Sequence, residues 1–335
     1  MLLFVLICVL IAICMFSVLD WIISCIKVKS NIVVENSHVM ITGGSSGIGL
    51  ALAKLYLSKG ANVTIVARNK IKLAQAAMVL EKEKVKKSQK VCIVSVDLTK
   101  DLLYIRNAYK EAQECNGSVN ILINCAGFAY CGTFENTDSE DFKLMMDTNF
   151  FGGVHMTKCV IDDMKKMEQG HIVFVSSIGG QLGLYGYTAY SASKFAVRGF
   201  AESLASELKP HNIGVSVAFP PDTDTPGFEN ENESKPEATK LISETAGLFT
   251  PDEVAEIIIK GVNNRQYLIW CGVDGFAMNT LTCGAAPPSS LGEVLVQVLL
   301  MGPLRLMILF YLWSFSRIIA KCTKAEKIQN KSKSE

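Results

Sequence analysis

A tyrosine and a lysine near the middle of the chain have the types and the spacing of a proton-transfer site. Tyr190 and Lys194 stand four residues apart, so a helix over Thr188–Leu208 would place both on one face. An ammonium that close favours the phenolate and predicts a lowered pKa for Tyr190. Such a tyrosine can donate a proton to a carbonyl oxygen or accept one from an alcohol. Taken alone, the pair is more typical of a solvated surface contact.

A serine thirteen residues before Tyr190 could hold the same oxygen. Ser177 ends the apolar run that begins at Gly170, which predicts a buried strand with a hydroxyl at its end. Ser176 is the alternative, and only one of the two can serve because adjacent strand residues face opposite ways. The spacing to Tyr190 favours Ser177.

Near the start of the chain, an apolar strand pattern, a glycine turn and a helical pattern follow one another over residues 37–57. Glycines allow a tight turn and a close approach of backbone to phosphate, and the helix N-terminus offers free N–H groups to a pyrophosphate. This context predicts dinucleotide binding. The residues expected at this phosphate site are Gly43, Ser45, Ser46, Gly47, Ile48 and Gly49. The same letters match the Gly-x-Ser-x-Gly turn of hydrolases, but the later tyrosine and lysine do not fit a hydrolase triad.

The end of the second predicted strand, Asn62–Ala67, indicates which dinucleotide is bound. An NAD enzyme places an acidic residue here to hold the ribose 2′-hydroxyl. This chain has Ala67 and then Arg68, whose guanidinium suits a 2′-phosphate, and Lys72 one turn later could add a second charge. The sequence therefore predicts NADPH as the cofactor; the alternative is that Arg68 only ends a strand in solvent.

Four further strand patterns alternate with helical ones. They lie at residues 91–98, 119–127, 170–177 and 213–219, and several end in small or polar residues. Asp97, at the end of the first of these, could accept a hydrogen bond from the adenine amine. The alternation predicts an α/β fold of the Rossmann type, with a doubly wound parallel sheet covered by helices on both faces.

Together these motifs closely resemble the short-chain dehydrogenase/reductase family over about residues 36–270. The resemblance implies that Tyr190 is the general acid/base, that Lys194 lowers its pKa and binds the nicotinamide ribose, and that Ser177 orients the substrate oxygen. It implies that Asn149 holds the water of a proton relay, although a mid-helix asparagine usually faces solvent or hydrogen-bonds back to its own helix. It also implies cofactor contacts at Leu98, Asn124, Ala126, Gly127, Pro220 and Thr225, besides those of Tyr190 and Lys194. The chain departs from the family pattern at Cys125 and at Pro221.

The loop after the sixth strand narrows the resemblance to the branch of the family that reduces 3-keto sphingoid bases. It carries the run from Pro220 to Phe228, and a second characteristic run lies at 281–287. This branch implies NADPH-dependent reduction of a long-chain keto-sphingoid lipid in sphingolipid biosynthesis, with a substrate lid at about 222–248. The alternatives are a membrane-bound retinol or steroid dehydrogenase, and a catalytically inactive NADP-binding scaffold.

Both ends of the chain are apolar enough to bind a membrane. Residues 1–26 are long enough to span a bilayer and are followed by Lys27 and Lys29, which predicts a transmembrane anchor with the catalytic domain facing the cytosol; a cleaved signal peptide is the alternative. Residues 271–320 predict a membrane-associated segment, followed by a basic tail at 321–335. Gly302-Pro303 should break or kink its helix, and Arg305 and Arg317 fit an interfacial or re-entrant arrangement. The resemblance implies that the protein is located in the endoplasmic reticulum membrane.

The composition excludes several classes of function. A formal net charge of +1 gives no indication of nucleic-acid binding. The 11 cysteines are scattered without metal-binding spacing, so we expect no metal site and predict reduced, buried thiols. The sequence does not indicate the oligomeric state, and a homo-oligomer is one of the possibilities.

Overall fold

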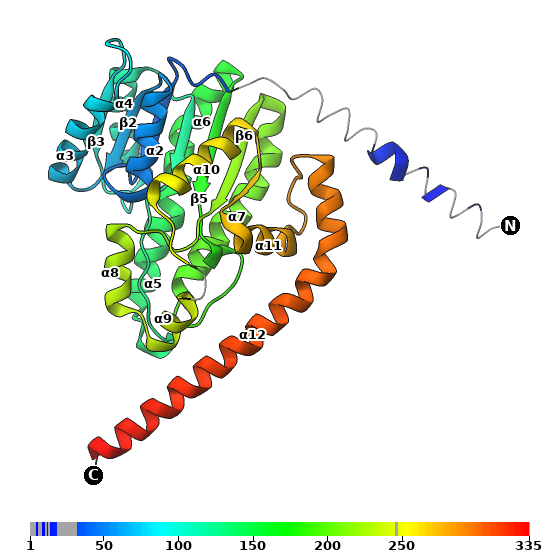
Figure 1. Ribbon diagram of the computed structural model, residues 1–335. Coiled ribbons are helices and arrows are strands. Elements are labelled where there is room, and N and C mark those ends of the chain that lie inside the picture. Colours follow the sequence, from blue (N-terminus) through cyan, green and yellow to red (C-terminus); the bar gives the residue numbers. More distant parts are fainter. Residues whose placement is uncertain are drawn as a thin grey trace.

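The computed structural model describes residues 32–244 and 247–334, together with residues 5, 9–10, 12 and 14–18. Within this part, seven strands form a single sheet in the order β3-β2-β1-β4-β5-β6-β7, and all neighbouring pairs are parallel (Figure 1). The strands are β1 (His38–Thr42), β2 (Asn62–Ala67), β3 (Val91–Ser95), β4 (Ile121–Asn124), β5 (Gly170–Val175), β6 (Ile213–Phe219) and β7 (Leu268–Trp270). The predicted doubly wound fold is confirmed.

Helices cover both faces of this sheet. The helices of the domain are α2 (Gly47–Ser58), α3 (Lys70–Leu80), α4 (Leu102–Asn116), α5 (Ser139–Met146), α6 (Gly152–Met167), α7 (Thr188–Leu208), α10 (Pro251–Asn263) and α11 (Gly272–Thr282), of which α5 packs against α7. Short helical turns lie at Glu81–Glu83, Phe134–Asn136, Asp147–Phe151, Ile178–Gly180 and Lys209–His211. Buried side chains of α4, α6 and α7 form the core on one face, and those of α2, α3 and α10 form it on the other. The strands are apolar on both faces because both are buried.

The structure places the predicted elements close to their expected bounds. Strands β2 and β6 and helix α7 have the predicted limits, whereas β3, β4 and β5 end two or three residues earlier than the apolar pattern does. The residues beyond these ends turn out of the sheet at its carboxyl edge. Because all strands are parallel, these turns gather along one edge, where doubly wound folds bind their ligands.

The segment predicted to be a substrate lid forms two short helices above this edge. They are α8 (Pro226–Ser234) and α9 (Glu237–Ser243). The base of the lid is closed by backbone hydrogen bonds: Asp224 donates to Phe249 over 2.8 Å, and Phe249 donates to Asp222 over 3.0 Å. The lid is therefore joined to the domain on both sides, with residues 245 and 246 outside the described part.

The C-terminal apolar segment forms a single long helix, α12 (Leu291–Ser334), with Pro303 inside it. The helix is therefore continuous across Gly302-Pro303, so a break, one of the two predicted outcomes, is wrong. The other, a kink, agrees with the bend that Figure 1 shows in α12. In apolar surroundings a break would leave several backbone groups without partners, which costs more than the one hydrogen bond that a proline removes. The helix packs against α11 and α9 and runs past the domain (Figure 1). In the described part of the chain it is the helix long and apolar enough to cross a membrane, which indicates membrane association.

The predicted division into anchor, reductase domain and C-terminal segment stays a prediction. Residues 1–26, the proposed anchor, fall largely outside the described residues. Helix α11 begins just after the predicted domain end at residue 270, yet it packs against β7 and buries Ala277 and Met278. This helix is thus part of the same folded domain as the sheet.

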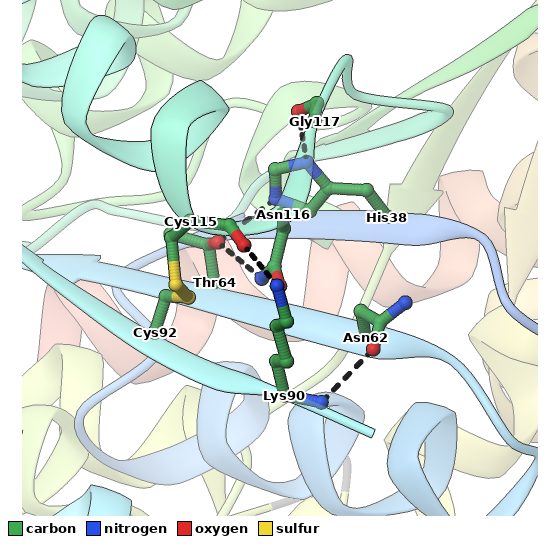
Figure 2. The surroundings of a disulfide bond; sticks show 8 residues. All are labelled: His38, Asn62, Thr64, Lys90, Cys92, Cys115, Asn116 and Gly117. Carbon is green, nitrogen blue, oxygen red and sulfur yellow. Dashed lines mark hydrogen bonds between the residues drawn. A yellow bond between two sulfur atoms is a disulfide. The ribbon is translucent and has the colours of Figure 1, made fainter. Parts of the chain in front are cut away.

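A disulfide joins β3 to α4 at the amino-terminal edge of the sheet, so the prediction that the cysteines are reduced is wrong for one pair. Cys92 and Cys115 are 23 residues apart in sequence, and their Cα atoms are 6.5 Å apart. Figure 2 shows the bond beside a polar cluster in which Asn116 donates to Thr64 and Lys90 donates to the carbonyl of Cys115. The bond and these contacts fasten the end of α4 to the sheet, on the edge opposite the turns that gather the predicted site.

Candidate active site

A cavity of about 640 Å³ opens at the carboxyl edge of the sheet. Most of the residues predicted for the site line it. They are Gly43, Ser45, Ser46, Gly47, Ile48, Gly49, Arg68, Lys72, Asp97, Leu98, Ala126, Gly127, Ser177, Tyr190, Lys194, Pro220 and Thr225. Asn124 and Asn149 lie behind its wall. The structure therefore brings together residues from six strand ends and from the lid.

The glycine turn between β1 and α2 has no room for side chains. Gly43 has a φ of +70°, and a Cβ on Gly49 would come within 2.4 Å of its carbonyl oxygen. A Cβ on Gly47 would lie 2.9 Å from the methyl group of Thr225 in the lid. The bare backbone and the N-terminus of α2, where no side chain caps the helix, fit a pyrophosphate.

The ends of β2 and β3 supply charges at the adenosine end of the cavity. Arg68 is exposed there, and Asn69 caps α3 by accepting hydrogen bonds from the backbone of Ile71 and Lys72. Burial alone would raise the pKa of Asp97, but hydrogen bonds from Thr99 and the charges of Arg68 and Lys100 outweigh it and lower the pKa. The charged Asp97 is an acceptor, and the cation beside it suits a ribose phosphate. These residues fit a nicotinamide dinucleotide.

The turn after β4 is held by a residue that the sequence analysis missed. The hydroxyl oxygen of Thr42 accepts hydrogen bonds from the backbone of Cys125 and Ala126, each over 3.0 Å. Asn124 donates to Thr157 of α6 over 3.4 Å, so its side chain serves the fold behind the cavity. Thr42 directly precedes the glycine turn, and that position was its one signal in the sequence.

Asn149 lies in a π-helical turn between α5 and α6 and is buried rather than solvent-facing. Its amide oxygen accepts from the backbone of Phe128, and its amide nitrogen donates to the carbonyl of Phe128 and to the hydroxyl of Ser193. A Cβ on Gly127 would lie 3.1 Å from the oxygen of Asn149 and 3.4 Å from the ammonium of Lys194. Gly127 thus keeps these two side chains close to one another.

Helix α7 carries the tyrosine and the lysine on one face, as predicted. The Nζ of Lys194 lies 5.6 Å from the centroid of the Tyr190 ring and donates to the carbonyl oxygen of Val175 over 3.0 Å. The Ser177 side chain lines the cavity beside Tyr190 and opposes the rise of its pKa, whereas Ser176 is buried and donates to the backbone carbonyl of Lys194. The geometry therefore favours Ser177 over Ser176 as the hydroxyl beside the reacting oxygen.

The prediction that the pKa of Tyr190 is lowered is wrong, because the surrounding protein groups raise it. Burial raises this pKa most, the charges of Glu231 and Asp222 raise it further, and the hydrogen bond with Ser177 opposes them. Burial also lowers the pKa of Lys194 to about 8. The protein therefore keeps the phenol protonated, which is the form that donates a proton to a carbonyl oxygen.

A family model and a similar protein of known name indicate the same protein family. The model described as short chain dehydrogenase matches residues 37–236. The 3-dehydrosphinganine reductase of Danio rerio is 48% identical over 289 residues, which are 86% of this chain and 87% of that protein. The chain belongs to the short-chain dehydrogenase/reductase family. It is an oxidoreductase that uses a nicotinamide dinucleotide.

Solved structures of this family share the fold. A short-chain dehydrogenase from Sphingobium yanoikuyae in complex with NADPH has a TM-score of 0.61 and 26% identity, covering 70% of this chain and 87% of that chain. One from Burkholderia phymatum in complex with NAD has a TM-score of 0.63 and 23% identity, covering 71% and 89%. The two cofactors differ, so the fold alone leaves the choice between NAD and NADP open.

The part of the cavity beyond Tyr190 is closed by apolar residues from the end of the chain. Helix α12 contributes Met307, Ile308, Tyr311 and Phe315, and α11 contributes Met278. The sequence predicts only membrane association for α12, because its uniform apolar pattern does not indicate which face meets the domain. The helix that marks membrane association is thus also a wall of this oxidoreductase's active site.

Proposed function

We propose that the protein reduces the 3-keto group of 3-ketodihydrosphingosine to the alcohol, yielding dihydrosphingosine in sphingolipid biosynthesis. The observation that carries the proposal is the apolar wall that α12 adds to a reductase centre. A membrane-associated helix beside the reacting carbonyl suits a substrate with a long hydrocarbon chain. The Danio rerio relative is named for the same reaction.

In this reaction Tyr190 donates its proton to the carbonyl oxygen. Ser177, which lines the cavity beside Tyr190, donates to the same oxygen and fixes its position. When bound, the cofactor supplies the hydride to the carbonyl carbon. Lys194 offers hydrogen bonds to the ribose next to the nicotinamide, and Asn149, whose amide bonds Phe128 and Ser193, holds the water that returns a proton to Tyr190.

We propose NADPH rather than NADH as the cofactor. The support is the cation at the end of β2: Arg68 is exposed beside the cavity, and Lys72 lines it one helical turn later. Ala67 occupies the position where an acidic side chain would hold the 2′-hydroxyl of NAD. A guanidinium there pairs with the 2′-phosphate that only NADPH carries.

Product analysis tests the proposed function. The purified full-length protein, given NADPH, is expected to convert 3-ketodihydrosphingosine to dihydrosphingosine and to reduce retinal or a ketosteroid far more slowly. Reduction of retinal or the ketosteroid with a higher kcat/KM would assign the protein to a membrane retinol or steroid dehydrogenase instead. NADPH binding without reduction of any of the three would make it a binding scaffold.

We propose that the protein resides in the endoplasmic reticulum membrane with its catalytic domain in the cytosol. The lysines after the first apolar run support this side, whereas the Cys92–Cys115 disulfide is more typical of an oxidising compartment. Asn232-Glu-Ser is a glycosylation acceptor in α8, and its asparagine is partly exposed. On sealed microsomes we expect protease to remove the domain and no glycosidase-sensitive band. A glycosidase-sensitive band that Asn232→Gln abolishes would place the domain in the lumen.

A further inference from the structure

The lid places two carboxylates beside the proposed proton donor. Asp222, which follows the two prolines after β6, and Glu231 of α8 both line the cavity that contains Tyr190. The hydroxyl of Tyr187 donates a short hydrogen bond to Glu231. The rings of Tyr187 and Tyr190 are 5.6 Å apart, so a single side chain separates Glu231 from the reacting phenol.

The charges of Asp222, Glu231 and the neighbouring Lys235 do not cancel. Lys235 is 4% exposed, and its ammonium lies 3.0 Å from a carboxylate oxygen of Glu231 and 4.5 Å from the ring centroid of Phe228. Asp222 accepts a hydrogen bond from the uncharged hydroxyl of Ser243. Among the described residues, the ion pairs of this group comprise Lys235 with Glu231 alone. One ammonium thus faces two carboxylates, and a net charge of −1 remains.

That negative charge acts on the reacting centre. The charges of both Glu231 and Asp222 raise the pKa of Tyr190. Two other carboxylates line the same cavity, but Asp97 lies at the cofactor end and Asp274 is exposed at the start of α11. The unbalanced charge therefore belongs to the lid, directly beside the position of the substrate carbonyl.

Apolar side chains line another part of the same cavity. Ile242 of α9, Met278 of α11 and Ile308 and Phe315 of α12 present apolar side chains. A ligand that matches both parts of the cavity has a cationic group next to its carbonyl and a long apolar tail. The substrate of the proposed function has this form, because its amine is bonded to the carbon next to the keto group and is protonated at neutral pH.

We propose that Asp222 binds the substrate's ammonium group, with Glu231 held alongside by Lys235 and Tyr187, and that the lid thereby selects α-amino ketones over neutral ketones. The inference rests on the proposed function and adds the recognition of the polar end. An ammonium here also replaces water around Asp222 and offsets the negative field at Tyr190. The same contact therefore selects the substrate and favours proton release from the phenol.

Two ketones that differ only in the amine test the proposal. The full-length protein is assayed with 3-ketodihydrosphingosine and with the 1-hydroxy-3-ketone of equal chain length that lacks the amine. A charge-assisted contact is expected to give the amino ketone a kcat/KM roughly 10- to 100-fold higher. Asp222→Asn should bring this ratio to within about threefold of one, and Asp222→Glu, which keeps the charge, should retain part of the preference. Asp224→Asn, on an exposed neighbour in the same loop, should leave the ratio unchanged.

The outcomes separate this inference from the proposed function. If the wild-type protein reduces both ketones equally well, or if Asp222→Asn leaves the ratio unchanged or lowers both rates by the same factor, the ammonium site is wrong while the reductase assignment stands. If neither ketone is reduced, the proposed function itself fails. Inhibition of the wild type by a long-chain primary amine, compared with the alcohol of equal length, gives the answer even if the Asp222 variants do not fold. Equal inhibition by both would overturn the proposal.

Discussion

Replacing Lys194 by methionine is expected to stabilise the folded protein while abolishing reduction. Burial lowers the pKa of Lys194 from 10.5 to about 8. Since each pKa unit corresponds to about 1.4 kcal/mol, the buried ammonium costs about 3 kcal/mol of folding free energy at neutral pH. Methionine retains an unbranched apolar side chain but leaves the carbonyl of Val175 without its 3.0 Å hydrogen bond, a loss of about 1 kcal/mol. The expected net gain is about 2 kcal/mol.

The pH dependence of this gain identifies its cause. The folded-state pKa lies below the unfolded value, so the charged lysine destabilises the folded state. This penalty is fully present below about pH 8 and disappears as the pH rises through 10.5. The advantage of Lys194→Met over the wild type should therefore shrink between these two pH values.

Thermal unfolding in one detergent, at pH 7 and at pH 10, measures the effect. At pH 7 the midpoint of Lys194→Met should rise by roughly 4 °C, and NADPH oxidation should be lost. Lys72→Met is the matched control, because Lys72 is exposed and its replacement should change the stability by less than about 0.5 kcal/mol. A lower midpoint for Lys194→Met at pH 7, or a gain of equal size at both pH values, would refute the argument from burial.

Three further substitutions test the site and the fold. Tyr190→Phe keeps the ring packed 5.6 Å from that of Tyr187 but removes the proton donor, so turnover should fall by roughly 10²- to 10⁴-fold with NADPH binding retained; near-normal turnover would end the proposed mechanism. Arg68→Ala should weaken NADPH binding by roughly 10- to 100-fold more than NADH binding, measured by cofactor titration, and equal losses would make Arg68 structural. Cys115→Ser opens a loop whose cysteines are 23 residues apart, so without reductant it should lower the free energy of unfolding by about 3 kcal/mol. Turnover should be unaffected, because the bond lies at the opposite edge of the sheet; an equally stable variant would mean that the bond adds nothing.

The sequence predicted best what depends on local pattern. Helix α7 and strands β2 and β6 have their predicted limits, because charged or turn-forming residues bound each apolar run. The glycine turn could also be predicted from the sequence, since it requires glycine: a Cβ at Gly49 would lie 2.4 Å from the backbone. These features are set by neighbours in the chain.

The features that could not be predicted from the sequence depend on residues that are close in space but distant in the chain. The spacing of Tyr190 and Lys194 shows a nearby charge but not the burial that outweighs it. Cys92 and Cys115 pair because the start of β3 lies beside the end of α4, which their separation along the chain does not indicate. Asp222 and Glu231 line the cavity because the fold turns their segment toward it, which their positions in the chain do not indicate.

Helix α12 limits how the enzyme can be truncated and purified. A chain cut before Leu291 to obtain a water-soluble enzyme would lose Met307, Ile308, Tyr311 and Phe315, and with them one side of the substrate cavity. Purification faces the same difficulty, because any detergent that coats the exposed face of α12 has a short path to the cavity and competes there as a mimic of the substrate's tail. Solubility and activity are therefore coupled in this protein, and a soluble version would need a replacement wall rather than a simple truncation.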